Sequence, residues 1–297
     1  MRFAEIGQQL RAYRLESGLR AEEIAARLGV SRAALYRYEK GEVIKLDTVK
    51  RLAELLKVSP LSLLGIGVEY YSRSAGYFER IRQVEEASDQ ILQAYGSICF
   101  LTTTDAFDSV LADSLMAAAE TGDTDRATAR SAAEQVLTLL SARKKAYQQR
   151  RPGIIAIISE AAVRTFLDLG LVGAASLSPS LRDKTQRVAA LEIGNIADMM
   201  DAEPMGLQFG LLPDGSSTSE FSIVRSGDRA TLAVNGFRAD GLPTSQTGVA
   251  MITGADEAVA AHQRVAEAVW REALKGKTAA QRLREILGNR PVALQAA

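Results

Sequence analysis

The side chains best suited to chemistry in this chain are cations that cluster near the N-terminus. Arg32, Arg37 and Lys40 lie in the stretch GVSRAALYRYEKGE (29–42), together with two tyrosines. A guanidinium presents a rigid fork of N–H donors that matches phosphate oxygens and guanine edges. Small alanines beside the arginines would let a helix approach a groove closely. The stretch therefore favours a helix that lies against a polyanion over an ordinary solvated helix face.

The distribution of charge agrees with this prediction. The 297 residues are 47% hydrophobic and 24% charged with no net charge, which suits a folded protein with a substantial core. Residues 1–65 nevertheless carry 12 Lys and Arg against eight Asp and Glu, whereas the remainder carries 24 against 28. A basic head on a mildly acidic body is the arrangement expected when the head meets a polyanion.

Catalytic and metal chemistry have few candidate residues. The chain has one histidine, His262, and one cysteine, Cys99, so it can form neither an intrachain disulfide nor a His/Cys metal site of three or four ligands. His262 is expected to be a packed or surface residue of a helix. Cys99 is expected to be an inert thiol in a buried strand, SICFLTT (97–103), rather than a redox sensor. No nucleophile–base pair or phosphate-binding loop is recognisable, so we predict no catalytic residue, no metal and no cofactor, and a protein that is not an enzyme.

Short amphipathic helices position the cationic stretch. The sequence predicts helices over 3–17, 21–29, from Arg32 to about Lys40, over 46–58, and a last short one after Ser59-Pro60. Gly29 would end the second helix, and Ser31 is placed to cap the third. Asp47 is the expected cap of the fourth helix, with Leu46 facing inward. Leu35 and Tyr38 are the residues of the third helix that we expect to face inward. The second and third helices, joined by a tight glycine-containing turn, form a helix-turn-helix.

At these residues the head resembles the lambda-repressor-like helix-turn-helix family, also called Cro-like or xenobiotic-response-element-like. The stretches GLRAEEIAARLGVSRAALYRYEKGE and LDTVKRLAELLKVSPLSLL carry the resemblance, over about 60 residues. It implies that the third helix enters the major groove of DNA and that Arg14 and Glu39 form a structural ion pair. Two positions depart from the family pattern: Ala21 replaces the usual glutamine, and EVIKLD lacks the usual proline. The first departure could move one backbone contact to Arg20.

The DNA-binding residues implied by the resemblance all lie in the head. They are Arg20, Ser31, Arg32, Ala33, Tyr36, Arg37, Lys40 and Lys45.

The remaining chain mixes helices and strands. GIGVEYYSRSAGY (65–77) is predicted to be a hinge, and 77–96 a helix that either joins two subunits or packs on the body. Strands are predicted within 97–103, 154–159, 205–213, 220–227, 229–237 and 248–254. Helices are predicted over 104–120, 126–150, 160–170, 180–201, 255–275 and 278–287, and turns at Pro213-Asp214-Gly215 and Ser226-Gly227-Asp228. Asp105 and Asp108 follow the first strand and could touch a ligand, although N-capping by Asp105 is favoured.

Short motifs in this part, including YQQRRPGIIAIISEAAVR and MGLQFGLLP, resemble an uncharacterised C-terminal domain of bacterial regulators that is expected to sense a ligand or partner. We therefore predict an all-α helix-turn-helix head (1–65), a linker with a connecting or dimerisation helix (66–96), and a mixed α/β or α+β sensor-like domain (97–297).

The function expected from these features is sequence-specific transcription regulation in the bacterial cytoplasm. A homodimer or dimer-based higher oligomer would bind a palindromic operator in double-stranded DNA, and a small-molecule effector would act through the body. The alternative is a partner-gated or antitoxin-like protein whose body binds another protein. No membrane association is expected, because the chain has no apolar run of about 18 residues.

Overall fold

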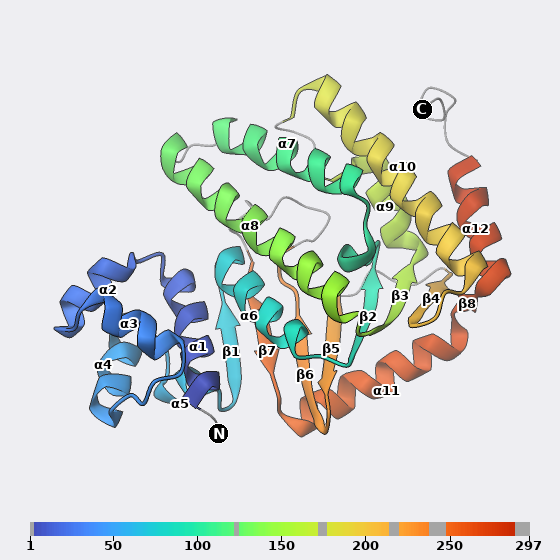
Figure 1. Cartoon of the computed structure of the whole chain (residues 1–297). Helices are drawn as coiled ribbons and strands as arrows, with labels where there is room; N and C mark the ends of the chain where they lie inside the picture. The colour runs from blue at the N-terminus through green and yellow to red at the C-terminus, as the bar shows by residue number, and fades with distance from the viewer. Residues whose placement is uncertain (1–2, 122–124, 172–176, 214–219, 238–247, 289–297) are drawn as a thin grey trace.

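The computed structural model describes residues 3–121, 125–171, 177–213, 220–237 and 248–288. The head consists of short helices (Figure 1), which are α1 (Phe3–Ser17), α2 (Ala21–Leu28), α3 (Arg32–Glu39), α4 (Leu46–Leu56) and α5 (Pro60–Leu63). The caps predicted for α2 and α3 are confirmed. Gly29 adopts a left-handed conformation at the end of α2, and the Ser31 side chain accepts a hydrogen bond from the backbone of Ala34 at the start of α3.

The head has an apolar centre to which every long helix contributes. Leu10, Ile24, Leu35 and Leu52 are fully buried there. The predictions for the start of α4 were wrong. The N-cap is Lys45, so Asp47 lies within the first turn, where its charge suits the helix dipole. Leu46 is 77% exposed because the inner face of α4 begins only at Val49.

The body is built on one eight-stranded mixed sheet. Its strands are β1 (Val68–Tyr71), β2 (Gln90–Gly96), β3 (Gly153–Ser159), β4 (Leu207–Leu212), β5 (Phe221–Ser226), β6 (Arg229–Val234), β7 (Ala250–Thr253) and β8 (Leu274–Lys275). Their order is β1-β7-β6-β5-β2-β3-β4-β8. The central strands β2, β3 and β4 are parallel, whereas the flanking pairs are antiparallel. This confirms the predicted mixed α/β body.

Helices cover both faces of the sheet. They are α6 (Ser74–Glu86), α7 (Asp105–Thr121), α8 (Arg126–Arg150), α9 (Glu160–Leu169), α10 (Pro179–Ala202), α11 (Asp256–Glu272) and α12 (Gly276–Gly288). On one face α11 packs through Val259 and Ala266 against Leu92, Ile157 and other strand residues. The other helices share a larger core with the opposite face of the sheet and with the head.

The segment between head and body was predicted incorrectly. Residues 68–71 form an edge strand paired with β7 instead of a hinge. The helix predicted over 77–96 ends at Glu86, and its second half is the central strand β2. Because α6 is buried within its own chain, between the head and α8, it is not available as a dimerisation helix in this arrangement.

The strand predicted over 97–103 is also absent. Tyr95 has a positive φ of 68° at the end of β2, and the chain then forms a short 3-10 turn, η1 (Phe100–Thr102). Thr104, rather than Asp105, lies before α7 and accepts a hydrogen bond from the backbone of Phe107. The turn predicted at Pro213-Asp214-Gly215 lies outside the described residues from Asp214 onward.

Head and body are joined by direct contacts between α1, β1 and α6. The rings of Tyr13 and Tyr71 stack with centroids 5.4 Å apart. The Glu16 carboxylate accepts hydrogen bonds from the backbone N–H groups of Ser72 and Arg73, at the N-terminus of α6. A carboxylate there satisfies free N–H groups and suits the helix dipole. The head is therefore held on the body rather than tethered by a free linker.

Candidate nucleic-acid interface

The outward face of α3 carries the predicted cations. Ser31, Arg32, Ala33 and Arg37 are exposed, and Tyr36 is half-buried. On the inner face Leu35 is fully buried, and Ala34 is buried as well, which the sequence interpretation had overlooked. Tyr38 is half-buried and packs against the core. The helix therefore separates a packed side from a side that faces solvent.

Both arginines of α3 are held by nearby groups. Arg32 pairs with Glu22 of α2 at 2.7 Å and donates hydrogen bonds to the Tyr36 hydroxyl, over whose ring it lies. These contacts with Tyr36, and then the charge of Glu22, raise the pKa of Arg32. Arg37 pairs with Glu42 at 3.3 Å. The arginine side chains are 58% and 61% exposed. Because water and salt screen such exposed ion pairs, they contribute little, and phosphates can replace the carboxylates at little cost.

The other predicted contact residues surround α3. Arg20 precedes α2, Lys40 follows α3, and Lys45 precedes α4; all three side chains are exposed. Each lies at the end of a helix of the head, as an exposed cation long enough to contact a nucleic-acid backbone.

A bidentate ion pair fixes the end of α3 to α1. The Arg14 Nε and Nη2 atoms donate to the two Glu39 oxygens at 2.5 and 3.1 Å, and the side chains are only 14% and 6% exposed. Burial lowers the pKa of Arg14, but its bonds to Glu39 outweigh this effect and raise the pKa overall. This is the pairing that the family resemblance implied, and its role is structural.

The closest approach between α1 and α3 requires a glycine. A Cβ atom on Gly7 would lie 2.5 Å from the Tyr38 carbonyl oxygen and 2.6 Å from that of Glu39. Because a backbone carbonyl cannot rotate away as a side chain can, we expect Gly7→Ala to lower the free energy of unfolding by about 1–3 kcal/mol despite alanine's better helix propensity. Urea unfolding of the full chain measures this loss.

Gly194, inside α10, is the matched control because a Cβ there would meet nothing within 4 Å. Gly194→Ala should be neutral or stabilising by about 0.5–1 kcal/mol. If Gly7→Ala stabilised the protein equally, the close contact between α1 and α3 would be contradicted.

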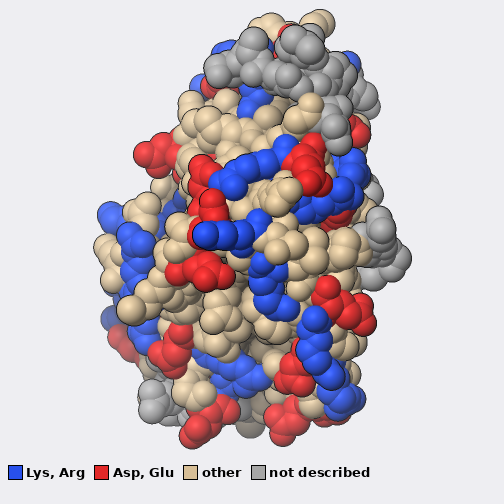
Figure 2. All heavy atoms as spheres, turned by 90° about the vertical axis from the view of Figure 1, so that its right-hand side faces the viewer, with Lys and Arg blue, Asp and Glu red and all other residues tan. Residues whose placement is uncertain are grey.

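On the side of the molecule away from the head, the cations of the described residues are not grouped in this way. Figure 2 shows basic and acidic side chains interspersed on this side. Cations of α12 are paired: Arg284 pairs with Asp198 and Asp201, and Arg282 pairs with Glu160. The charge pattern therefore favours the head as the part of the protein that meets a polyanion.

The single histidine and the single cysteine of the chain are both packed against other parts of the body. The Nδ1 atom of His262 lies 2.9 Å from the Ala258 carbonyl oxygen, and its ring packs edge-on against Phe221. Cys99 is 2% exposed, and burial raises the pKa of its thiol to about 11. At neutral pH this sulfur is therefore a protonated thiol, and not the thiolate that reacts as a nucleophile.

Several basic residues lie near the end of α8, namely Arg143, Lys144, Lys145, Arg150 and Arg151, and part of this group is internal. Lys144 is buried, and its ammonium pairs with Asp108 at 2.6 Å and donates to the Thr103 carbonyl. Asp108 is thus a partner of Lys144, whereas Asp105 is exposed.

Within the described ranges, no group of three or more His, Cys, Asp and Glu side chains is arranged so that it could hold a metal ion. None of the described helices has the length and apolar character required to cross a membrane.

Sequence reasoning missed two features that depend on tertiary contacts. One is a buried polar cluster between head and body, centred on Glu69, Arg80 and Gln9. The other is a pocket in the body between α6, α8 and the central strands. A glutamate inside an otherwise β-prone segment, VEYY, is the one sequence signal that pointed to the first.

Comparison with known proteins identifies the head. Residues 5–64 match the family model of a helix-turn-helix domain, which is the region that forms α1 to α5. The match supports a helix-turn-helix DNA-binding head. A search of curated proteins found no match.

Among solved structures, the chain is similar to TrmBL2, an archaeal chromatin protein described with a novel mode of DNA binding. The sequence identity is 11% and the TM-score 0.34, over 77% of this chain and 62% of that one. The chain thus spans less than two thirds of that protein's length, and a TM-score this low does not establish a shared fold.

Proposed function

We propose that the protein is a cytoplasmic transcription regulator whose α3 enters the major groove of a palindromic operator. The exposed face of α3, with Arg32 and Arg37 projecting from a helix-turn-helix domain, is the observation that supports this function. A homodimer would place two copies of α3 about 34 Å apart, one turn of DNA. The body would supply the second function, which is to bind an effector that changes the position or exposure of the heads.

A regulatory rather than catalytic body is part of this proposal. The environments of His262 and Cys99 support it, since one packs against Phe221 and the other is a buried neutral thiol. The partner-gated alternative shares the same head and differs in what the body binds; the enclosed pocket in the body favours a small molecule.

DNA binding by α3 can be tested with the purified full chain and DNA from the region upstream of its own gene. Arg32→Ala and Arg37→Ala are each expected to weaken specific binding about 10- to 100-fold, because each removes a fork of donors from the groove. Affinity should fall steeply as salt increases, and less steeply for a variant that has lost a phosphate contact.

Arg284→Ala is the matched control, because Arg284 is an exposed, ion-paired arginine on α12, on the side away from the head. Its affinity for DNA should equal that of the wild type. If binding is equal on any DNA sequence and unchanged by both α3 substitutions, the arginines form only a solvated surface and the proposed function is wrong.

A further inference from the structure

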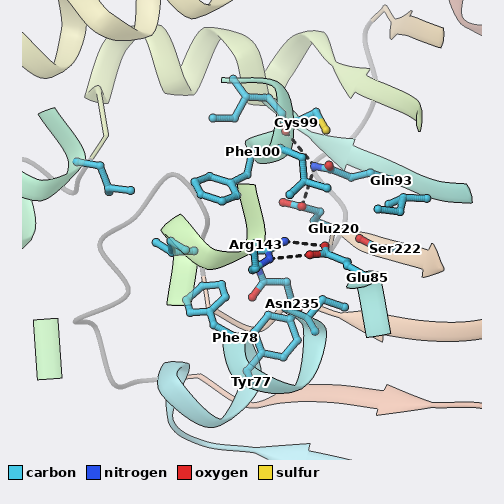
Figure 3. Close-up of a pocket in the computed structure, with 16 residues that line it drawn as sticks. Tyr77, Phe78, Glu85, Gln93, Cys99, Phe100, Arg143, Glu220, Ser222 and Asn235 are labelled. Atoms are coloured by element: carbon cyan, nitrogen blue, oxygen red, sulfur yellow. Dashed lines mark hydrogen bonds and ion pairs between the residues drawn. The ribbon is translucent and has the colours of Figure 1, made fainter. Parts of the chain in front are cut away.

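The central ion pair of the pocket in the body does not select for the charge of a ligand. Figure 3 shows Arg143 of α8 and Glu85 of α6 facing each other there, joined by hydrogen bonds of 2.7 and 2.8 Å, so these two charges cancel. The pocket is also narrow, since only about 60 Å³ of it can hold the centre of a water molecule. A wider space with more distinctive chemistry lies between the head and the body.

This second space, the junction cavity, has walls from both parts of the protein. Its head side is formed by α1 and the segment between α5 and β1, and its body side by α6, the turn between β5 and β6, and the first residue of α11. About 390 Å³ of it can hold the centre of a water molecule. The lining residues that bear most on a ligand are Gln9, Gln83, Asp228 and Asp256. A molecule bound there would contact head and body at once.

Two buried amide oxygens of this lining have no hydrogen-bond donor. Gln9 and Gln83 are 1% and 5% exposed, and among the described residues the Oε1 atom of each has no partner. The Nε2 atom of Gln9 donates to the Glu69 carboxylate at 2.6 Å. That of Gln83 donates to Glu79 at 2.8 Å and to the Gln8 carbonyl oxygen at 3.2 Å. Exchanging nitrogen and oxygen in either amide would bring two oxygens together, so both Oε1 assignments are fixed.

The two amide oxygens indicate a donor from outside the described residues. Buried polar groups nearly always have a hydrogen-bond partner, and a buried acceptor without one is unfavourable. Both oxygens are covered in the present arrangement, so a donor in the cavity reaches them when the side chains that cover them move aside. Because Gln9 belongs to α1 and Gln83 to α6, such a donor would join the head to the body.

The charged groups of the lining also leave acceptors free. Arg80 and Arg229 are each already paired with a glutamate, at 2.9 and 2.7 Å. Asp228 and Asp256 are exposed at the open side of the cavity and have no ion-pair partner within the described part of the chain. Carboxylates and amide oxygens all accept hydrogen bonds. The cavity therefore suits a ligand that is positively charged and rich in N–H donors.

We propose that the junction cavity binds a small aliphatic diamine or polyamine, and that this ligand strengthens the attachment of the head to the body. One ammonium group would pair with Asp228 and Asp256 at the open side. The N–H donors of the other end would meet the amide oxygens of Gln9 and Gln83. The flexible carbon chain between them would lie along apolar lining residues such as Val84.

Binding at the junction would act on the head through α1. This helix carries Gln9, and it also supports α3, through the close contact at Gly7 and the pair between Arg14 and Glu39. A ligand that bridges α1 and the body stabilises the present position of the head relative to any other. Under the proposed function, such a ligand would alter DNA affinity to the extent that the head binds DNA better in another position.

Calorimetric titration of the full chain with three probes of similar length tests the cavity. The probes are 1,4-diaminobutane, 1-aminobutane and the neutral 1,4-butanediol. The diamine should bind about tenfold more tightly than the monoamine, because only the diamine has a donor for each end, and the diol should bind weakest. Asp228→Asn combined with Asp256→Asn should lower the affinity for the diamine about tenfold. Asp183→Asn, at an exposed aspartate of α10, is the control and should leave it unchanged.

Thr231→Phe provides a second, independent variant, because a larger side chain at this half-buried lining position fills the cavity. It should abolish binding of the diamine and of the monoamine while circular dichroism shows the fold retained. No binding of any probe would show that the cavity holds only solvent. That result, equal binding of diamine and diol, or binding unaffected by both the aspartate substitutions and Thr231→Phe would overturn the assignment of the cavity.

Backbone hydrogen exchange measures the attachment of the head. Saturating 1,4-diaminobutane should slow exchange in β1 and at the start of α6, where the head contacts the body, about fivefold or more in the wild type. It should have no effect in the double aspartate variant. Unchanged exchange in the wild type with the diamine bound would overturn the strengthened attachment. Neither measurement involves DNA, so a head that fails to bind DNA would refute the proposed function without affecting these tests.

Discussion

Replacing Glu69 with alanine is expected to lower the free energy of unfolding by about 3–5 kcal/mol. The Glu69 carboxylate accepts four hydrogen bonds: from the Gln9 amide and the Tyr71 hydroxyl, both at 2.6 Å, and from two nitrogens of Arg80, at 2.9 and 3.0 Å. Glu69 as a whole is only 5% exposed. One side chain thus connects α1 of the head with β1 and α6 of the body.

The loss of stability in Glu69→Ala comes from the buried polar groups that remain without their partner. Without Glu69, the Arg80 guanidinium keeps its charge although its side chain is only 16% exposed. The buried side chains of Gln9 and Tyr71 also lose their hydrogen-bond acceptor. Burial lowers the pKa of Arg80, and the charge of Glu69 offsets this and raises the pKa overall. Removing one member of a buried pair is far more costly than removing both, because the remaining charge has no partner.

Urea unfolding of the wild type, Glu69→Ala, Arg80→Leu and the double variant measures this effect. The double variant should recover part of the loss, because it leaves no unpaired charge. Glu54→Ala, at an exposed glutamate of α4, should change stability by less than about 0.5 kcal/mol. A loss below about 1 kcal/mol for Glu69→Ala would show that the polar cluster contributes little to the attachment of the head.

The sequence predicted the head well because its signals are local. Gly29 and Ser31 mark the turn between α2 and α3 by their own backbone chemistry, and the buried positions of α2 repeat every three to four residues. The exposed cations of α3 could be predicted for the same reason. The exception, Leu46, lies in the first turn of α4, before the face that packs begins.

The body shows where local patterns are insufficient. Residues 90–96 continue the apolar spacing of α6, and the sequence alone could not separate them from a helix. They form a strand because β3 and β5 pair with them on both sides. Likewise Glu69 and Tyr71 form part of an edge strand only because β7 lies beside them. Pairings between residues more than 60 positions apart leave no periodic signal in either segment.

The pocket could not be predicted for a related reason. Its charged residues, Glu85, Arg143 and Glu220, come from α6, α8 and the segment before β5, and each alone resembles an ordinary surface charge. Arg143 lies beside Lys144 and Lys145 near the C-terminal end of α8, where cations are common. Only the folded chain places its guanidinium between two phenylalanine rings and opposite Glu85.

Replacing Arg143 with methionine is the second change from which we expect a large effect, a loss of about 3–5 kcal/mol in the free energy of unfolding. Burial lowers the pKa of the Arg143 guanidinium, but Glu85 more than offsets this, so the pKa is raised and the charge is retained. Methionine keeps much of the apolar contact with Phe78 and Phe100. It leaves the Glu85 carboxylate about 90% buried without its cation.

Two further variants separate the charge of Arg143 from its shape. Glu85→Gln combined with Arg143→Met removes both charges and should restore most of the lost stability. Arg143→Lys keeps the charge but cannot form the bidentate bond or stack as a plane, so it should recover less than the double variant. If Arg143→Lys were fully stable, charge alone would explain the site; a stable Arg143→Met would show that the pair contributes nothing. In the second case the pair would not fix the centre of the pocket, and the position of α6 against α8 would depend on apolar contacts alone.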